Sequence, residues 1–125
     1  LMGVKMGGGE ELILTISIPS SGVNRGEVIR KALEASRIAD YILLDTRGPI
    51  GGGTGLPHDW TLSGEIRKML KKPVFLAGGL THSNVRKAIE IVRPYGVDVA
   101  SGVESKPGIK DPELMYKFVK AVRSP

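Results

Sequence analysis

The 125-residue sequence predicts an α/β fold built from four successive parallel βα units. Four short apolar runs alternate with segments whose apolar residues recur at helical spacing. Glycine, with 17 residues, is about twice its average usage, as expected for a fold with many tight connections. No signal for an antiparallel hairpin separates the units. Such units form either an open doubly wound sheet or part of a βα barrel, and the pattern alone does not distinguish them.

Each predicted strand is followed by a predicted helix. We expect strands at 11–19, 41–46, 74–77 and 96–100, and helices at 27–38, 62–71, 85–92 and from 112 onward. The candidate N-caps are Thr61 or Ser63 for the second helix and Thr81 or Ser83 for the third. The last helix has the strongest start, with Asp111 as N-cap and Pro112 at its first position. Residues expected to face the core include Ile38, Met69 and Val119.

The length indicates one domain over residues 10–125, and residues 1–9 are interpreted as a linker or remnant. The chain has no cysteine, which excludes a disulfide framework and a cysteine nucleophile. Because His58 and His82 lack metal-ligand spacing, we expect no metal, and we expect no cofactor. No apolar run reaches a membrane span and no signal peptide is visible, so we expect no membrane contact and a cytoplasmic protein.

The positive charge of the chain bears on its partners. The formal net charge is +5, and the lysines and arginines are spread along amphipathic segments rather than clustered. This distribution favours a solvated basic surface and gives no support for nucleic-acid binding. A secondary interpretation is attraction of a phosphorylated small-molecule substrate.

Asp45 is the candidate catalytic residue. It ends an apolar run in which Tyr41, Leu43 and Asp45 share one face, while Ile42 and Leu44 form the other. Both faces are mostly apolar, which predicts a strand covered on both sides. A carboxylate at the carboxyl end of such a strand lies where βα folds place their chemistry. The alternative is that Asp45 only caps the following loop.

A glycine-rich loop follows Asp45. Its centre consists of Gly52, Gly53, Thr54 and Gly55. Such a loop allows close approach of the backbone to a ligand or movement as a lid, and the simpler alternative is flexibility. Asp59 and Trp60 are interpreted as anchors of this loop.

Small-residue turns follow the third and fourth predicted strands. These turns are Gly78-Gly79 and Ser101-Gly102, and the first leads almost directly into a helix. Free backbone N–H groups at such turns favour a phosphate, although glycines also simply permit tight turns. Asp98 lies in the middle of the fourth predicted strand, where burying a carboxylate is costly without a partner. It is either a site residue or half of a structural ion pair. Glu104 and Lys106 in the loop beyond are either that partner or solvated charges, and solvation is favoured for Lys106.

These motifs resemble one family, phosphoribosylanthranilate isomerase of tryptophan biosynthesis. The matching motifs are L-L-D-T at 43–46, G-G-T-G at 52–55 with D-W at 59–60, L-A-G-G-L at 76–80 with N-V at 84–85, and G-V-D-V-A-S-G-V-E at 96–104. Members are eight-stranded βα barrels, so the resemblance implies half of a TIM-type (βα)8 barrel, corresponding to strands five to eight.

The resemblance also implies roles for individual residues in an Amadori rearrangement of N-(5′-phosphoribosyl)anthranilate. Asp45 matches the general acid, and the glycine loop looks like the mobile lid. The residues that match the phosphate-holding loops are Gly78, Gly79, Ser101 and Gly102. Asp98 matches a carboxylate near the substrate.

Two departures from the family pattern concern the general base and the packing of the loop before Trp60. The family's general base is a cysteine at the end of the first strand, whereas this chain has no cysteine. His58 stands where the family usually has Phe. We therefore expect the chain alone to be inactive, and to form a homodimer or associate with a missing N-terminal half. The alternatives are another phosphosugar βα-barrel enzyme and a non-catalytic half-barrel scaffold or phosphate-binding module.

Overall fold

The computed structural model describes residues 2–6, 11–19, 22–47 and 60–124. Within these residues it contains a five-stranded sheet in the order β1-β2-β3-β4-β5 and a two-stranded sheet of β6 and β7. The strands are β1 (Met2–Met6), β2 (Leu12–Pro19), β3 (Tyr41–Arg47), β4 (Val74–Ala77), β5 (Gly96–Val97), β6 (Glu104–Lys106) and β7 (Ile109–Lys110). The helices are α1 (Arg25–Ser36), α2 (Trp60–Met69), α3 (Val85–Val92), the 3-10 turn η1 (Ser101–Val103) and α4 (Pro112–Arg123).

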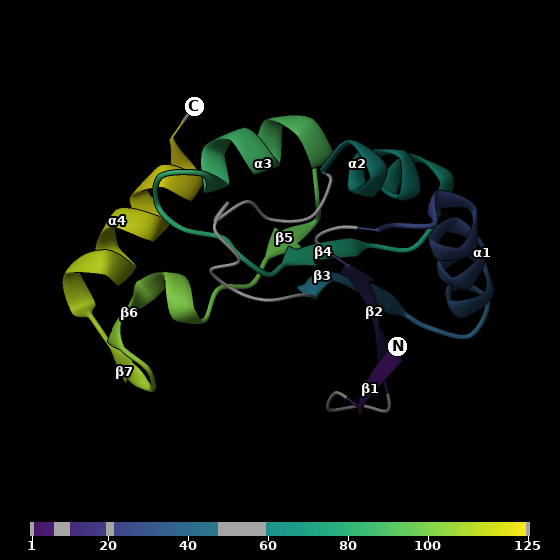
Figure 1. Cartoon of the computed structure of the whole chain (residues 1–125), viewed down its shortest axis with the longest axis horizontal. Helices are drawn as coiled ribbons and strands as arrows, with labels where there is room; N and C mark the ends of the chain where they lie inside the picture. The colour runs from purple at the N-terminus through teal and green to yellow at the C-terminus, as the bar shows by residue number, and fades with distance from the viewer. Residues whose placement is uncertain (1, 7–10, 20–21, 48–59, 125) are drawn as a thin grey trace.

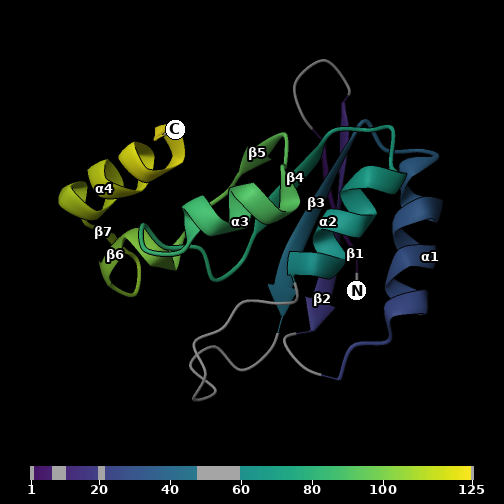
Figure 2. The ribbon, with the colours of Figure 1, turned by 90° about the horizontal axis from the view of Figure 1, so that it is seen from above.

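The strands β2 to β5 pair in parallel, as the four βα units predict. The helices form an outer arc around the sheet, and the opposite face of the sheet points to the concave side of the molecule (Figure 1). In Figure 2 the arrowheads of β2 and β3 point to the same end of the sheet. The four parallel strands therefore have their carboxyl termini at the same end of the sheet.

Alternation along the strands separates a buried face from an open one. The fully or nearly fully buried strand residues are Leu14, Ile16, Ile18, Ile42, Leu44, Val74 and Leu76. They join one core with buried residues of the helices, such as Val28, Leu62, Ile66, Val85 and Phe118. Tyr41, Leu43 and Asp45, on the other face of β3, are only half-buried. The prediction of cover on both faces is therefore wrong, because all four helices lie along the outer arc.

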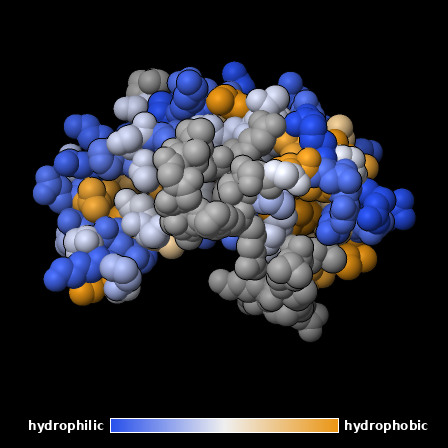
Figure 3. All heavy atoms as spheres, in the orientation of Figure 1, coloured by the Kyte–Doolittle hydropathy of each residue, from blue (hydrophilic) through white to orange (hydrophobic). Residues whose placement is uncertain are grey.

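The hydrophilic surface agrees with this layering. Figure 3 shows hydrophilic residues over the outward surfaces of α1 and α4. Within the part of the chain that the structure covers, no helix has the length and apolar character needed to cross a bilayer.

Helix starts follow the local capping chemistry. The prediction for α4 is confirmed, since the Asp111 carboxylate accepts a hydrogen bond from the backbone N–H of Glu113 at 2.8 Å. α1 begins two residues before its predicted start, at Arg25, because the Asn24 side chain caps it. The N-caps predicted for α2 are wrong, since Thr61 and Ser63 lie inside the helix. The expected inward residues Ile38, Met69 and Val119 are exposed, at 69%, 49% and 46%.

Three features of the strands differ from the prediction. Residues Met2–Met6, expected in a linker or remnant, form β1 and pair antiparallel with Leu12–Ile16 of β2. The fourth parallel strand is limited to Gly96–Val97. A hairpin of β6 and β7 follows it, turning at Gly108, whose φ of +81° suits glycine. β1 is thus the outer strand at one edge of the main sheet, and β6 and β7 form a separate hairpin.

Candidate functional site

Two carboxylates lie on the open face of the sheet, where the parallel strands end. Ser17, Asp45 and Ala77 are partners in register across β2, β3 and β4. Asp98 continues this row, because its backbone N–H donates to the Leu76 carbonyl at 2.9 Å. Asp45 therefore lies at the carboxyl end of a parallel strand, the end at which βα folds place their sites, with Asp98 two strands away in the same row.

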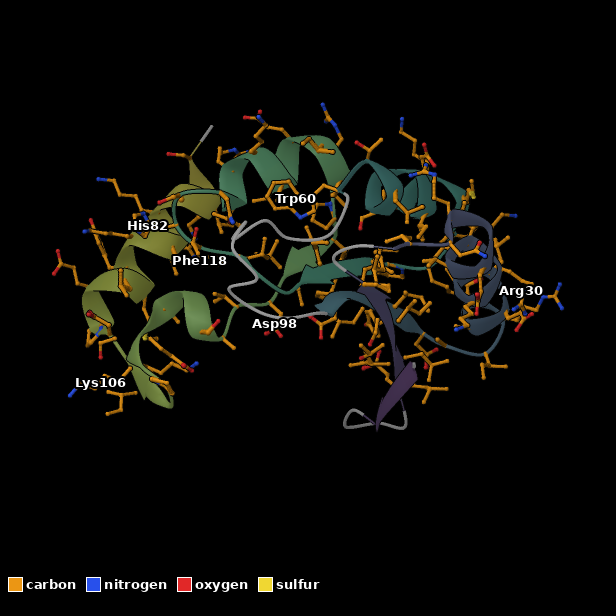
Figure 4. The ribbon with its side chains drawn as sticks, viewed as in Figure 1. Arg30, Trp60, His82, Asp98, Lys106 and Phe118 are labelled. Atoms are coloured by element: carbon orange, nitrogen blue, oxygen red, sulfur yellow. The ribbon has the colours of Figure 1, made fainter. Side chains whose placement is uncertain are left out.

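The sequence predicts Asp98 in the middle of a strand, where its carboxylate would be buried, and the structure does not place it there. The strand ends before it, and its side chain is exposed. Figure 4 shows it on the concave side of the sheet, away from α2 and α3. The expected cost of burial therefore does not arise, and no compensating ion pair is needed. Its suggested partner Glu104 instead bonds Lys110 at 2.8 Å, and Lys106 is exposed.

The turn after β4 has the backbone geometry that glycine allows. Gly78 and Gly79 have φ angles of +89° and +69°, in the left-handed region where other residues are strained. The Asn84 side chain fastens this turn on both sides. Its Oδ1 accepts from the backbone N–H of Thr81 at 2.8 Å, and its Nδ2 donates to the Gly79 carbonyl at 2.9 Å. Asn84 thus holds the glycine turn directly before α3.

Asn84 is a positioning residue that the sequence analysis quoted in a motif without a role. It also takes the cap position of α3, where Thr81 or Ser83 had been predicted, although its side chain bonds the turn rather than the helix. An asparagine five residues after a glycine turn is a usable sequence signal, because its side chain bonds nearby backbone groups.

The two small-residue turns are in direct contact. A Cβ placed on Gly102 would lie 1.9 Å from the carbonyl oxygen of Leu80, so only glycine fits there. Leu80 is buried directly after the Gly78-Gly79 turn. The structure therefore brings Gly78, Gly79, Ser101 and Gly102 together at the ends of neighbouring strands.

The β6–β7 hairpin stabilises the second turn. Lys110 donates from Nζ to the Ala100 carbonyl at 3.1 Å as well as to Glu104. The Glu104 carboxylate also accepts the backbone N–H of Gly108 at 3.2 Å. These bonds from Lys110 and Gly108 hold the pKa of Glu104 below its ordinary value. Sequence reasoning gave Lys110 no role.

Several predicted site residues lie outside the described residues. They are Gly52, Gly53, Thr54 and Gly55 of the expected lid, together with His58 and Asp59. Trp60 begins α2 and packs partly against the core. His82 is half-buried in the turn before α3. Within the described ranges, no group of three or more His, Cys, Asp or Glu side chains is placed to hold a metal ion.

The structure combines parallel strands covered by outer helices, a carboxylate at one strand end, and two glycine-containing turns at the neighbouring strand ends. This is the arrangement of TIM-type βα-barrel enzymes, whose sites lie at the carboxyl ends of the strands and whose phosphate sites come from late βα loops. The family described as N-(5′-phosphoribosyl)anthranilate (PRA) isomerase matches residues 12–121. The chain belongs to this family.

Similar proteins agree with the family and show how much of it is present. The N-(5′-phosphoribosyl)anthranilate isomerase of Methanopyrus kandleri is 54% identical over 91 residues, which are 73% of this chain and 42% of that protein. A crystal structure of generated monomers of the dimeric enzyme from Thermotoga maritima matches with a TM-score of 0.67 and 35% identity, covering 87% of this chain and 48% of that one. An isomerase in complex with reduced 1-(o-carboxyphenylamino)-1-deoxyribulose 5-phosphate matches with a TM-score of 0.65 and 34% identity, covering 87% and 47%. The chain thus spans about half the length of these proteins.

Proposed function

We propose that this chain supplies the general-acid and phosphate-binding half of a phosphoribosylanthranilate isomerase. The observation that carries the proposal is the position of Asp45. It lies at the carboxyl end of β3, on the open face, in register with Ala77 at the end of β4. The similarity to an isomerase complexed with a reduced product analogue supports the same substrate class.

In this proposal Asp45 acts as the general acid. It protonates the ring oxygen of the phosphoribosyl group, the bond from that oxygen to C1 of the sugar breaks, and a Schiff base forms with the anthranilate nitrogen. A general base then removes the proton from C2, and the resulting enolamine tautomerises to the ketone. The proton that Asp45 donates is balanced by the proton that the base removes from C2, so substrate and product have the same composition, as an isomerisation requires.

The substrate phosphate is proposed to bind between the two glycine turns. Backbone N–H groups of Gly78, Gly79, Ser101 and Gly102 are its donors in this proposal. Support comes from the contact of Gly102 with Leu80, which places the two turns side by side, and from Asn84, which fastens the first turn. Asp98 faces the same open side and is proposed to contact the substrate near the ring. The proposed lid is the segment containing Gly52, Gly53, Thr54 and Gly55.

The general base is not among these 125 residues, because the family's general base is a cysteine and the sequence has none. The open face of the sheet is the natural place for the part that supplies it, since half-buried apolar residues such as Leu43 and Phe75 lie on it. We propose that a half barrel carrying the N-terminal strands of the family completes the site. Pairing with a second copy of this chain is the alternative, and it would leave the site without a base.

The test is turnover of phosphoribosylanthranilate, followed by loss of its fluorescence. The chain is assayed alone and mixed with a separately produced N-terminal half of a family member that contains the cysteine. We expect activity only in the mixture, lost in Asp45→Asn. The matched control is Asp40→Asn, just before β3 at its opposite end, where an asparagine oxygen can still accept the Leu12 N–H.

Each other outcome has a meaning. If the mixture forms a complex but has no activity, the proposed isomerase function is rejected and a scaffold or phosphate-binding module is favoured. Activity of the chain alone would show that a base other than cysteine is present. Sedimentation of the chain alone reports whether it forms a homodimer.

A further inference from the structure

A basic cavity lies at the opposite end of the sheet from the proposed isomerase site. It has a volume of about 560 Å³ and is formed where α2 ends and β4 begins. Val74, the first residue of β4, lines it, whereas Ala77 at the other end of the same strand adjoins the glycine turn. The cavity and the proposed substrate site are therefore separated by the length of β4.

The charged side chains described around this cavity are all positive. Four cationic residues line it, Arg67, Lys68, Lys71 and Lys72, and none of the described lining residues is Asp or Glu. The Lys72 ammonium donates to the Ala39 carbonyl at 2.7 Å, which holds that charge in place. The volume is in the range of small-molecule sites, but those are mostly lined by apolar side chains.

Several cations elsewhere in the described chain have carboxylate partners, whereas none of these four pairs with a carboxylate among the described residues. Lys31 pairs with Glu27, Arg30 with Glu34, and Lys117 with Glu113. Glu65, the one carboxylate on α2, pairs with Arg25 of α1 instead of a cavity residue. Like charges gathered around one cavity repel each other, and an anion in the cavity relieves that repulsion.

The helix dipole explains only part of this cluster. Arg67 and Lys68 lie in the last turn of α2, where cations are favoured by the negative end of the helix. Lys71 and Lys72 follow the helix and line the same cavity, so the dipole does not account for them. Tyr95 also lines the cavity. Its backbone N–H donates to the Val74 carbonyl at 2.7 Å, and its largely exposed ring meets Phe75 edge-on at 5.4 Å.

We propose that this cavity binds a small ligand carrying two or more linked phosphate groups. Four cations exceed what one phosphate needs, and the space holds more than one. The donors here are guanidinium and ammonium groups at the end of a helix, which distinguishes this site from the backbone N–H groups proposed for the substrate phosphate. The proposal does not depend on isomerase activity.

The experiment is calorimetric titration of the full chain with inorganic tripolyphosphate at low salt. The double variant Lys68→Ala with Lys71→Ala is expected to bind about fivefold more weakly or worse, because two exposed charges next to the anion are lost. The matched control, Lys117→Ala with Lys120→Ala, removes the same charge from exposed positions of α4 and is expected to bind like the wild type. Circular dichroism checks the fold of each variant.

Equal weakening by both double variants would overturn the proposal, since the net charge of the chain would then account for binding. So would the absence of any tripolyphosphate binding. Asn84→Ala tests the location, because it perturbs the glycine turn and leaves this cavity intact. Loss of tripolyphosphate binding in Asn84→Ala would place the anion at the strand ends instead. Failed turnover with retained binding here would reject the proposed isomerase function alone.

Discussion

Gly102 packs its backbone against the carbonyl oxygen of Leu80, and this contact joins the loops that follow two neighbouring strands. A Cβ at position 102 would meet that oxygen at 1.9 Å and the Val99 side chain at 3.2 Å. The Leu80 oxygen belongs to the backbone, so it has little room for adjustment. The contact explains why the second turn needs glycine without any unusual φ angle.

Gly102→Ala should therefore destabilise the chain by about 3 kcal/mol, at the upper end of the usual cost of overpacking. Urea unfolding measures the loss. Gly26→Ala is the matched control, since its nearest neighbour would be the Asn24 side chain at 3.7 Å, and it should be neutral or slightly stabilising. Equal stability of the two variants would contradict the contact.

Asn84→Ala should cost about 1–2 kcal/mol, because it leaves the Thr81 N–H and the Gly79 carbonyl without their partner. It should also weaken binding of a substrate phosphate analogue, since the glycine turn loses its support. Asn24→Ala removes a comparable bond at the start of α1 and should lose about 1 kcal/mol of stability. A phosphate affinity lowered equally in both variants would show a general effect of stability.

Glu104 gives the hairpin a pH-dependent contribution to stability. Its pKa is lower in the folded chain than the ordinary 4.5, so its contribution is present above that value and is lost as the pH falls through the lowered pKa. Glu104→Gln should therefore be less stable than the wild type at pH 7, and the difference should disappear in strong acid. Urea unfolding at several pH values tests this. Glu113→Gln, which removes the same charge from an exposed pair on α4, is the matched control.

The β1 strand should compete with a partner for the edge of β2. In a closed βα barrel this edge pairs in parallel with the preceding strand, whereas here Met2–Met6 occupies it in antiparallel register. Deleting residues 1–6, or replacing them with a Gly-Ser segment of equal length, should strengthen association with an N-terminal half barrel. Analytical ultracentrifugation of the mixtures measures the affinity. Weaker association in both variants would mean that β1 is part of the interface.

The parallel βα framework could be predicted because its signals are local. Alternation placed Ile42 and Leu44 opposite Asp45, and Asp111 with Pro112 marked the start of α4. The β6–β7 hairpin was missed although the dipeptide ending in Gly108 is a usual turn signal. The strand expected over 96–100 is short because only Gly96 and Val97 pair with β4.

The candidate site was predictable to a different degree. Alternation and strand order are enough to place Asp45 at a strand end. The contact between Gly102 and Leu80 was not predictable from spacing, because it joins loops that are brought together only by strand pairing and helix packing. For the same reason the sequence did not show that Glu104 would pair with Lys110 rather than approach Asp98.

The two edges of the main sheet have a consequence for behaviour at high concentration. Unpaired strand edges are templates on which other chains add and grow into fibrils. Here the five-residue β1 is the edge strand on one side, in place of the eight-residue β2, and the other edge is only the two residues of β5, followed at once by the charge of Asp98. Both edges of the open half barrel are therefore short, whereas a chain that loses β1 exposes the longer β2 edge, which can bind a partner half barrel and can also add other chains.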